Sequence, residues 1–177
     1  MNQQTVRVRA RRWRMLRACS AALGLVALLS AAPLAYADSD AATAHAWQVV
    51  QRYLAAWNAH DVAAANRVLA PSVTYFNTSV GMESQGPDVI AGLQDRLLRL
   101  MPDLRWQIVG EPVITDDGVA FEWEVTGNAR LLAETAHPSL TRPVRLRGAS
   151  FARVEHGRIV YLADYYNGLS MQKQLAP

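Results

Sequence analysis

One carboxylate lies where acid/base chemistry is expected, on an apolar stretch near the C-terminus. Asp164 falls within residues 158–167, which are mostly β-branched, aromatic or aliphatic and which follow the turn-forming pair His156-Gly157. These features predict a strand that is entered through a hairpin. Because burial disfavours the charged form of a carboxyl group and raises its pKa, Asp164 is a candidate general acid or base.

The alternation of strand side chains divides this stretch between two apolar faces. One face is predicted to hold Val160, Leu162, Asp164 and Tyr166, and the other to hold Ile159, Tyr161, Ala163 and Tyr165. A structural ion pair is the alternative role for Asp164, because the preceding predicted strand carries Arg142, Arg145, Arg147 and Arg153. Ion pairs also perturb pKa values, so the residues alone leave both roles open.

Other catalytic chemistries lack their motifs. The chain has no Gly-rich phosphate loop and no Gly-x-Ser-x-Gly turn, and its single cysteine, Cys19, lies in the N-terminal segment. Its histidines lie on separate predicted elements without metal-ligand spacing: His45, His60, His137 and His156. We therefore expect no metal and no cofactor, and we expect His60 to have a surface or capping role.

The N-terminal segment has the features of a signal peptide. Six arginines precede an apolar run from about Ala21 to Leu29, and residues 35–37 form a small-x-small cleavage site. The apolar run is too short to span a membrane stably. We expect cleavage after Ala37 and a periplasmic or secreted protein without membrane attachment, while Arg11-Arg12 leaves twin-arginine export open.

Removal of residues 1–37 changes the composition that bears on function. Of the 177 residues, 140 remain, enough for one domain over residues 38–177 with a hydrophobic core and no disulfide. Six of the 18 basic residues leave while all 15 acidic residues stay, so the net charge changes from +3 to −3. A mildly acidic domain with dispersed charges lacks the basic patch that binds nucleic acid, so we expect no nucleic-acid partner.

Apolar spacing predicts two helices before the first strand. The first runs from about Ala41 to Asn58 with Asp40 as its N-cap, and the second runs from about residue 62 to 69, is capped by Asp61 and ends at Pro71. A short strand over residues 73–77 and a loop over residues 78–85 follow. Pro87 is then expected in the first turn of a third helix, which Pro102 ends.

Four strand-like segments come next, at residues 104–115, 119–132, 142–155 and 158–167. Tight turns are expected at residues 116–118 and 156–157, a longer loop at 134–141, and a short helix at the C-terminal end. The order of helix, helix, strand, helix and strand meander predicts an α+β fold with helices on one face of an antiparallel sheet.

Four stretches together resemble the SnoaL-like polyketide cyclase family, of the nuclear-transport-factor-2-like superfamily, in order and spacing. They are residues 53–61, 101–106, 120–127 and 157–166, so the resemblance covers nearly all of residues 38–177. It implies a cone-like, curved antiparallel sheet wrapped around the N-terminal helices and enclosing a pocket. The superfamily includes enzymes and binding modules, so the fold alone does not assign a function.

The resemblance implies an acid/base role for Asp164, which matches the aspartate on the last long strand of SnoaL-type cyclases. Tyr75 and Asn77 resemble the Tyr-x-Asn pair that holds a water in the similar limonene epoxide hydrolases, and they share one face of a predicted strand. Those hydrolases have an Arg-x-Asp pair where this chain has Glu122-Trp-Glu124. This difference argues against the hydrolase reaction, and we expect both glutamates to face solvent.

These inferences predict a cofactor-independent acid/base enzyme that cyclises, isomerises or cleaves a small apolar or aromatic carbonyl or ester compound. Asp164 would move the proton, and Tyr75 and Asn77 would orient the reacting group or a water. The walls of the ligand site are expected from five aromatic residues: Tyr53, Trp57, Trp106, Trp123 and Tyr166.

Three alternatives stay open. Each of the five aromatic residues could be ordinary core. The domain could bind or carry a ligand, with Asp164 as a polar anchor only. It could also be a dimerisation module, because the far side of the last strand is apolar as well, and a homodimer is expected on this ground.

Overall fold

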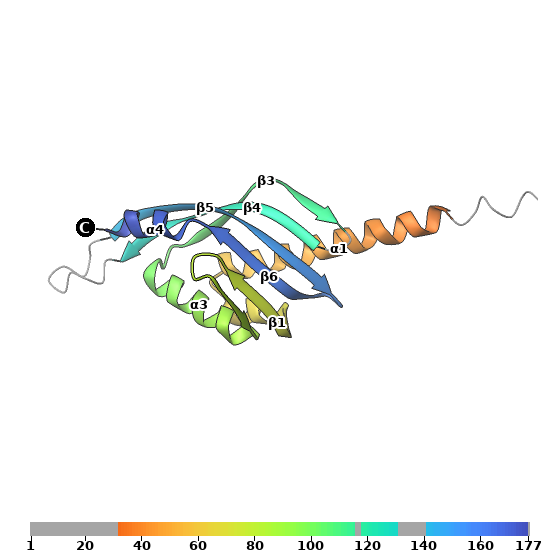
Figure 1. Ribbon diagram of the computed structural model, residues 1–177, viewed down its shortest axis with the longest axis horizontal. Coiled ribbons are helices and arrows are strands. Elements are labelled where there is room, and N and C mark those ends of the chain that lie inside the picture. The colour runs from red at the N-terminus through yellow and green to blue at the C-terminus, as the bar shows by residue number, and fades with distance from the viewer. Residues whose placement is uncertain (1–31, 116–117, 131–140, 177) are drawn as a thin grey trace, which may run out of the picture.

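The structure, a computed structural model, describes residues 32–115, 118–130 and 141–176. Its elements in chain order are α1 (Ala32–Asn58), α2 (Val62–Arg67), β1 (Leu69–Asn77), β2 (Met82–Gln85), α3 (Pro87–Leu100), β3 (Arg105–Thr115), β4 (Gly118–Arg130), β5 (Thr141–Glu155), β6 (Arg158–Tyr166) and α4 (Gly168–Leu175). Figure 1 shows the long strands arching over α1, with α3 on the same side of the sheet.

A single six-stranded sheet, in the order β2-β1-β6-β5-β4-β3, forms the framework. The predicted antiparallel meander from β3 to β6 is confirmed, and the α+β fold with a curved, unclosed sheet is confirmed with it. One pairing differs from the expected antiparallel sheet, because β1 runs parallel to β6. This pairing brings Asn77 beside Asp164, although the two residues are far apart in the sequence.

The predicted hairpin between β5 and β6 is present, but it contains a bulge. His156 and Gly157 both have positive φ, at 50° and 74°, as the tight turn requires. Val154 pairs with Ile159 whereas Arg153 pairs with Tyr161, so Val160 is an extra residue on β6. The bulge changes the alternation of faces. Ile159, expected on the face of Tyr161, is fully buried in the core cluster with Leu162.

The structure corrects three predicted boundaries. Helix α1 begins at Ala32, so Asp40 lies within the helix and is not its N-cap; the many alanines of this stretch favour helix upstream of it. Helix α2 ends at Arg67, and Pro71 lies in β1, where pairing with β6 is interrupted and a missing N–H is tolerated. Residues 82–85, expected in a loop, form β2, which is too short and polar to show a strand pattern.

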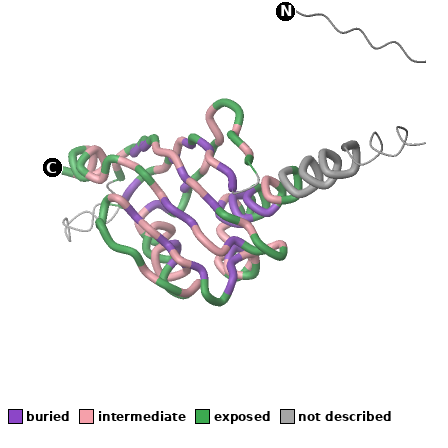
Figure 2. Tube along the Cα trace, turned by 45° about the vertical axis from the view of Figure 1, so that its right-hand side comes forward, coloured by how far each residue is buried: buried purple, intermediate pink, exposed green. Residues whose placement is uncertain are grey.

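The core lies between the helices and the inner face of the sheet. Val49, Val50 and Trp57 of α1 pack in one cluster with Leu69 and Ile159 of the sheet. In Figure 2 the buried segments follow the strands and the C-terminal part of α1, whereas the loops at the ends of the strands are exposed. The interior is therefore bounded by α1 and α3 on one side and by the curved sheet on the other.

Some predicted features lie outside the described residues. These are most of the proposed signal peptide, the turn at residues 116–117, and most of the 134–141 loop with His137. Within the described helices, none has the length and apolarity needed to cross a membrane.

Candidate active site

Asp164 lies in a row of residues that crosses three neighbouring strands. The sheet register sets Asp164 of β6 beside Asn77 of β1 on one side and opposite Ser150 of β5 on the other. The Tyr75 hydroxyl donates a 2.8 Å hydrogen bond to Asp164 Oδ2, and the Ser150 hydroxyl donates a 2.6 Å bond to Asp164 Oδ1. Each oxygen of the carboxylate thus has its own donor.

The Tyr75 hydroxyl is oriented by a second layer of hydrogen bonds. Asn77 Oδ1 accepts from the backbone N–H and the hydroxyl of Ser79, at 2.9 and 2.8 Å, which turns Nδ2 of the same amide toward Tyr75. Asn77 Nδ2 then donates to the Tyr75 hydroxyl at 2.9 Å. Because that hydroxyl oxygen accepts from Asn77, its own proton is free to point at Asp164.

Ser150 is oriented in the same way from the opposite side. Trp123 Nε1 donates a 2.8 Å hydrogen bond to Ser150 Oγ, which leaves the serine proton for Asp164. Ser150 is only 3% exposed and Trp123 only 2%, so this relay is closed to solvent. The carboxylate is therefore held by two chains of polar groups that come from β1 and β4.

Burial raises the pKa of Asp164 above its ordinary value, and the hydrogen bonds from Ser150 and Tyr75 oppose this rise without cancelling it. The pKa of Tyr75 is raised far above the range of a free phenol by burial and by the nearby charge of Asp164. Tyr75 is therefore a neutral donor at every pH of interest, and Asp164 is the group that titrates.

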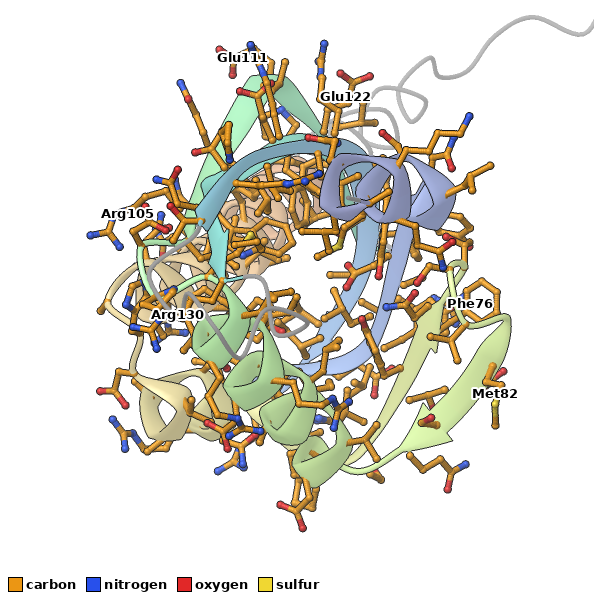
Figure 3. The ribbon with its side chains drawn as sticks, turned by 90° about the vertical axis from the view of Figure 1, so that its left-hand side faces the viewer. Phe76, Met82, Arg105, Glu111, Glu122 and Arg130 are labelled. Carbon is orange, nitrogen blue, oxygen red and sulfur yellow. The ribbon has the colours of Figure 1, made fainter. Side chains whose placement is uncertain are left out.

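The ion-pair role considered for Asp164 is not found among the described residues. Arg145 bonds Glu124 at 2.6 Å, and Arg147 bonds Glu122 at 3.1 Å. The Arg153 guanidinium lies 5.5 Å from the centre of the Tyr161 ring. Neither glutamate lines a chamber. Glu122 faces solvent, as expected, with its side chain 65% exposed on the outside of the sheet (Figure 3), whereas the Glu124 side chain is only 12% exposed because Arg145 covers it.

Two adjoining chambers lie between the sheet and the helices. Asp164, Tyr75, Trp57 and Trp106 line both of them. The outer chamber has a cavity volume of about 50 Å³ and is partly open to solvent, and its wall is mainly apolar. Figure 3 looks into this interior, between α3 and the curved sheet. The candidate acid/base group thus faces a mostly apolar cavity.

The five aromatic residues predicted for the ligand site all line these chambers. Trp57, Trp106, Trp123 and Tyr166 line the outer chamber, and Tyr53 lines the inner one. Trp106 packs between the other two tryptophans, with its ring centre 5.6 Å from that of Trp57 and 4.5 Å from that of Trp123. Trp57, Trp106 and Trp123 thus form one continuous aromatic wall.

Sequence reasoning missed Ser150 and most of the aliphatic wall. Ser150 carried no signal, because regular pairing from the His156-Gly157 turn would set Ala149 opposite Asp164. Leu93 and Leu97 of α3, Met101 directly after that helix, and Met171 of α4 line the outer chamber. Apolar residues at helical spacing do not distinguish core from cavity wall, so the sequence alone carried no signal for these residues.

Histidines and acidic groups form no metal site in the part of the chain that the structure describes. His60 has φ of 57° and lies 2.9 Å from the Leu104 carbonyl oxygen at the junction of α1 and α2, outside both chambers. The His60 backbone N–H bonds the Trp57 carbonyl at the end of α1, which agrees with the capping role among the two roles expected for it.

Replacement of Ser150 by alanine is expected to raise the pKa of Asp164 further, because the charged carboxylate loses one donor. It also leaves the buried Trp123 N–H without its acceptor, which should lower the free energy of unfolding by about 1–3 kcal/mol. Carboxyl-carbon NMR titration and urea unfolding measure the two effects. Ser72→Ala, at an exposed position of β1, is the matched control; an unchanged Asp164 pKa in Ser150→Ala would contradict the assignment.

The raised pKa of Asp164 also predicts how stability depends on pH. Between the unfolded pKa of about 4 and the higher folded pKa, the folded chain holds a proton that the unfolded chain has lost, so stability falls as pH rises. Asp164→Asn cannot titrate. Its stability relative to wild type is therefore expected to increase with pH across this window, as measured by urea unfolding at successive pH values. A constant difference between the two proteins would refute a raised pKa.

Comparison with known proteins gives one family and many similar structures. The family described as SnoaL-like domain matches residues 50–162. A candidate polyketide cyclase of Xanthomonas campestris pv. campestris is 25% identical with a TM-score of 0.62, over 76% of this chain and 99% of that chain. AclR, a candidate hydroxylase of Streptomyces galilaeus, is 20% identical with a TM-score of 0.64, over 75% and 82%.

A third similar structure is a Catenulispora acidiphila protein with a ketosteroid isomerase-like fold, in complex with trimethylamine. It is 22% identical with a TM-score of 0.58, over 71% of this chain and 90% of that chain. No curated protein matches the chain.

Proposed function

This chain belongs to the SnoaL-like domain family, and from that premise we propose that it is a cofactor-independent cyclase or isomerase in which Asp164 is the general acid/base. The substrate is a small apolar or aromatic carbonyl or ester compound. Membership alone does not carry this proposal, because one fold hosts many activities. The observation that carries it is the half-buried, titratable Asp164 carboxyl between two oriented donors in a mostly apolar chamber.

In the proposed reaction the Asp164 carboxylate removes a proton from the carbon next to the substrate carbonyl. The electron pair of the broken C–H bond forms a C=C bond while the C=O π electrons move to the carbonyl oxygen, which gives an enolate. Return of the proton from Asp164 at another position completes an isomerisation. Attack of the enolate carbon on a second carbonyl, whose oxygen takes the proton back from Asp164, completes a cyclisation. A base whose pKa is raised toward the working pH is well suited to both directions of transfer.

Tyr75 and Ser150 contribute by holding the carboxylate. Tyr75 lines both chambers and Asn77 lines the outer one, so both are placed to touch a substrate, and Asn77 also orients the Tyr75 hydroxyl. Tyr75→Phe should therefore raise the pKa of Asp164 and move the acid limb of the pH–rate profile to higher pH.

Proton exchange tests the proposal without knowledge of the natural substrate. Small aromatic ketones, such as 1-tetralone and 2-acetylnaphthalene, are incubated with the protein in D₂O, and loss of the proton signal next to the carbonyl is followed by NMR. We expect the wild-type protein to catalyse exchange above the rate in buffer alone, and we expect Asp164→Asn not to do so. Equal exchange by both proteins, or none by either, would remove the support for an acid/base enzyme.

A ligand carrier is the second candidate. It is favoured by the lack of a second ionisable carboxyl, histidine or lysine among the described residues that line the chambers. A carrier would bind the ketones without any exchange, and its affinity would change only modestly in Asp164→Asn.

We also propose that the protein is exported and loses residues 1–37. Every buried residue that the structure describes is Val49 or a later residue, so the proposed cleavage removes none of that core. The N-terminal residue of protein recovered from the periplasm or medium, determined by mass spectrometry, should be Asp38. A protein that keeps its first residues in the cytoplasm would contradict export.

A homodimer is proposed from the outer face of the sheet. Phe76 of β1 and Tyr165 of β6 pack there with ring centres 5.9 Å apart, and Tyr165 is 47% exposed. Figure 3 shows Phe76 and Met82 pointing away from the interior. Light scattering after size exclusion should give twice the monomer mass, and Tyr165→Lys should lower it because a charge cannot be buried there cheaply.

A further inference from the structure

The three tryptophans of the aromatic wall differ in what their indole N–H groups bond. Trp123 Nε1 donates to Ser150, as described above. Among the described residues, Trp57 Nε1 and Trp106 Nε1 have no hydrogen-bond acceptor, and both atoms are buried. Buried N–H groups are nearly always paired in folded proteins, and an unpaired one is costly. Two such donors on one cavity wall therefore need an acceptor from inside the cavity.

Both tryptophans line the part of the cavity that holds Asp164. Trp57 and Trp106 line the inner and outer chambers together with Asp164. The Trp57 side chain opposes the rise that burial causes in the pKa of Tyr53, but the Trp57 N–H and the Tyr53 hydroxyl do not meet hydrogen-bond geometry. The two indoles and the candidate acid/base group thus border the same cavity.

The positions of Trp57 and Trp106 are linked through Asn58, the residue that follows Trp57. The Asn58 side chain, next to Trp57 in α1, accepts from the Trp106 backbone N–H at 2.7 Å and donates to the Trp106 carbonyl at 2.9 Å. This pair of hydrogen bonds links the end of α1 to β3. The two donors are therefore preorganised rather than gathered on binding, which is the property that makes a donor pair effective toward a developing charge.

The charge of the site selects the kind of acceptor. Among the described residues that line the chambers there is no lysine, arginine or histidine, and Asp164 carries the only carboxyl group. An anionic ligand would gain no counter-ion and would be repelled by ionised Asp164. A neutral carbonyl oxygen accepts two hydrogen bonds and brings no charge.

We propose that the indole N–H groups of Trp57 and Trp106 bind the carbonyl oxygen of the substrate, which is a neutral ketone or ester and not a free carboxylic acid. This inference rests on the proposed function and specifies its substrate class. When Asp164 takes the proton from the adjacent carbon, the C=O π electrons move to that oxygen, and the two indoles stabilise the resulting enolate. The aromatic part of the substrate then packs in the apolar outer chamber.

Binding of matched probes to the full chain tests this site. 2-Acetylnaphthalene carries the carbonyl, 2-isopropenylnaphthalene has the same shape with a CH₂ group in place of the oxygen, and 2-naphthoate is the anion. Wild type should bind the ketone roughly 10-fold more tightly than the alkene, as two neutral hydrogen bonds suggest, and the naphthoate more weakly than the ketone. No preference for the ketone, including no binding of either neutral probe, overturns the proposal.

Trp57→Phe and Trp106→Phe remove one N–H each and keep an aromatic wall. Each should lower ketone affinity about 3- to 5-fold and leave alkene affinity unchanged, which also shows that the variant is folded. Trp47→Phe is the control, because Trp47 packs on Phe121 and lines neither chamber. In indole NMR the ketone should shift the Trp57 and Trp106 N–H signals and not that of Trp123. Equal losses for ketone and alkene would overturn the donor role.

Asp164→Asn separates this inference from the proposed function. It should abolish proton exchange and keep the preference for ketone over alkene. If exchange depends on Asp164 but the tryptophan variants show no selective loss, the indole site is wrong and acid/base catalysis stands. If the selective loss is present and no exchange is catalysed, the carbonyl site stands and the protein is a carrier.

Discussion

Replacement of Asp164 by asparagine is expected to lower the rate of catalysed proton exchange about 10²- to 10⁴-fold, the usual contribution of a general acid or base. The amide has nearly the same shape, and its oxygen can still accept from Tyr75 or Ser150, so the fold should persist. The chemical step fails because the amide neither accepts nor releases a proton in this pH range. NMR exchange rates under saturating ketone measure the effect.

The control for this variant is Asp95→Asn, the same change at an exposed position of α3. Its exchange rate should equal that of wild type. Far-UV circular dichroism and the affinity for 2-acetylnaphthalene establish that Asp164→Asn is folded and binds. A folded, ligand-binding Asp164→Asn protein that exchanges protons at the wild-type rate would exclude Asp164 as the acid/base group.

Replacement of Gly148 by alanine is expected to be the most disruptive small change in the sheet. Gly148 of β5 lies opposite Trp123 of β4, and an added Cβ would stand 2.6 Å from Trp123 Cη2 and 2.7 Å from the Tyr165 carbonyl oxygen. The backbone oxygen cannot move aside, and the indole can move only by leaving Ser150. Overpacking of this kind should lower the free energy of unfolding by about 3 kcal/mol.

Loss of activity should accompany this loss of stability, because displacement of Trp123 releases the Ser150 hydroxyl that holds Asp164. Urea unfolding and the exchange assay measure the two effects. Gly92→Ala is the matched control: its Cβ would meet only the Arg96 side chain, at 3.5 Å, and alanine within a helix should stabilise by roughly 0.5–1 kcal/mol. A Gly148→Ala protein as stable as wild type would contradict the packing described here.

The order of elements and the meander of long strands followed from the sequence because each has a local signal. The His156-Gly157 turn, the Pro87 helix start and the apolar strands are examples of such signals, and all three are present in the structure. The parallel pairing of β1 with β6 has no local signal, since it depends on how the chain returns after β5. The start of α1 was missed because its alanine-rich composition outweighed the cap signal of Asp40. The polar strand β2 was missed because it depends on pairing with β1 and shows no apolar periodicity.

The candidate site was predictable where one strand sufficed. Alternation along β6 placed Asp164, Leu162 and Tyr166 on the inner face, and the same rule on β1 placed Tyr75 with Asn77. Contacts between strands were not predictable, because the extra residue Val160 shifts the register and brings Ser150, rather than Ala149, opposite Asp164. The lack of an acceptor for the Trp57 and Trp106 indole N–H groups among the described residues was not predictable either. It depends on side-chain geometry that a sequence does not encode locally.

The measurement that tests the account most directly is the pKa of Asp164 in the folded protein. Carboxyl-carbon NMR titration can follow it, with Asp164→Asn to assign the signal. Burial in a chamber without a described ion-pair partner predicts a pKa clearly above the ordinary value of about 4. A pKa at or below that value would show a carboxylate whose basicity is not raised, and would contradict the role of Asp164 as the group that takes and returns the substrate proton.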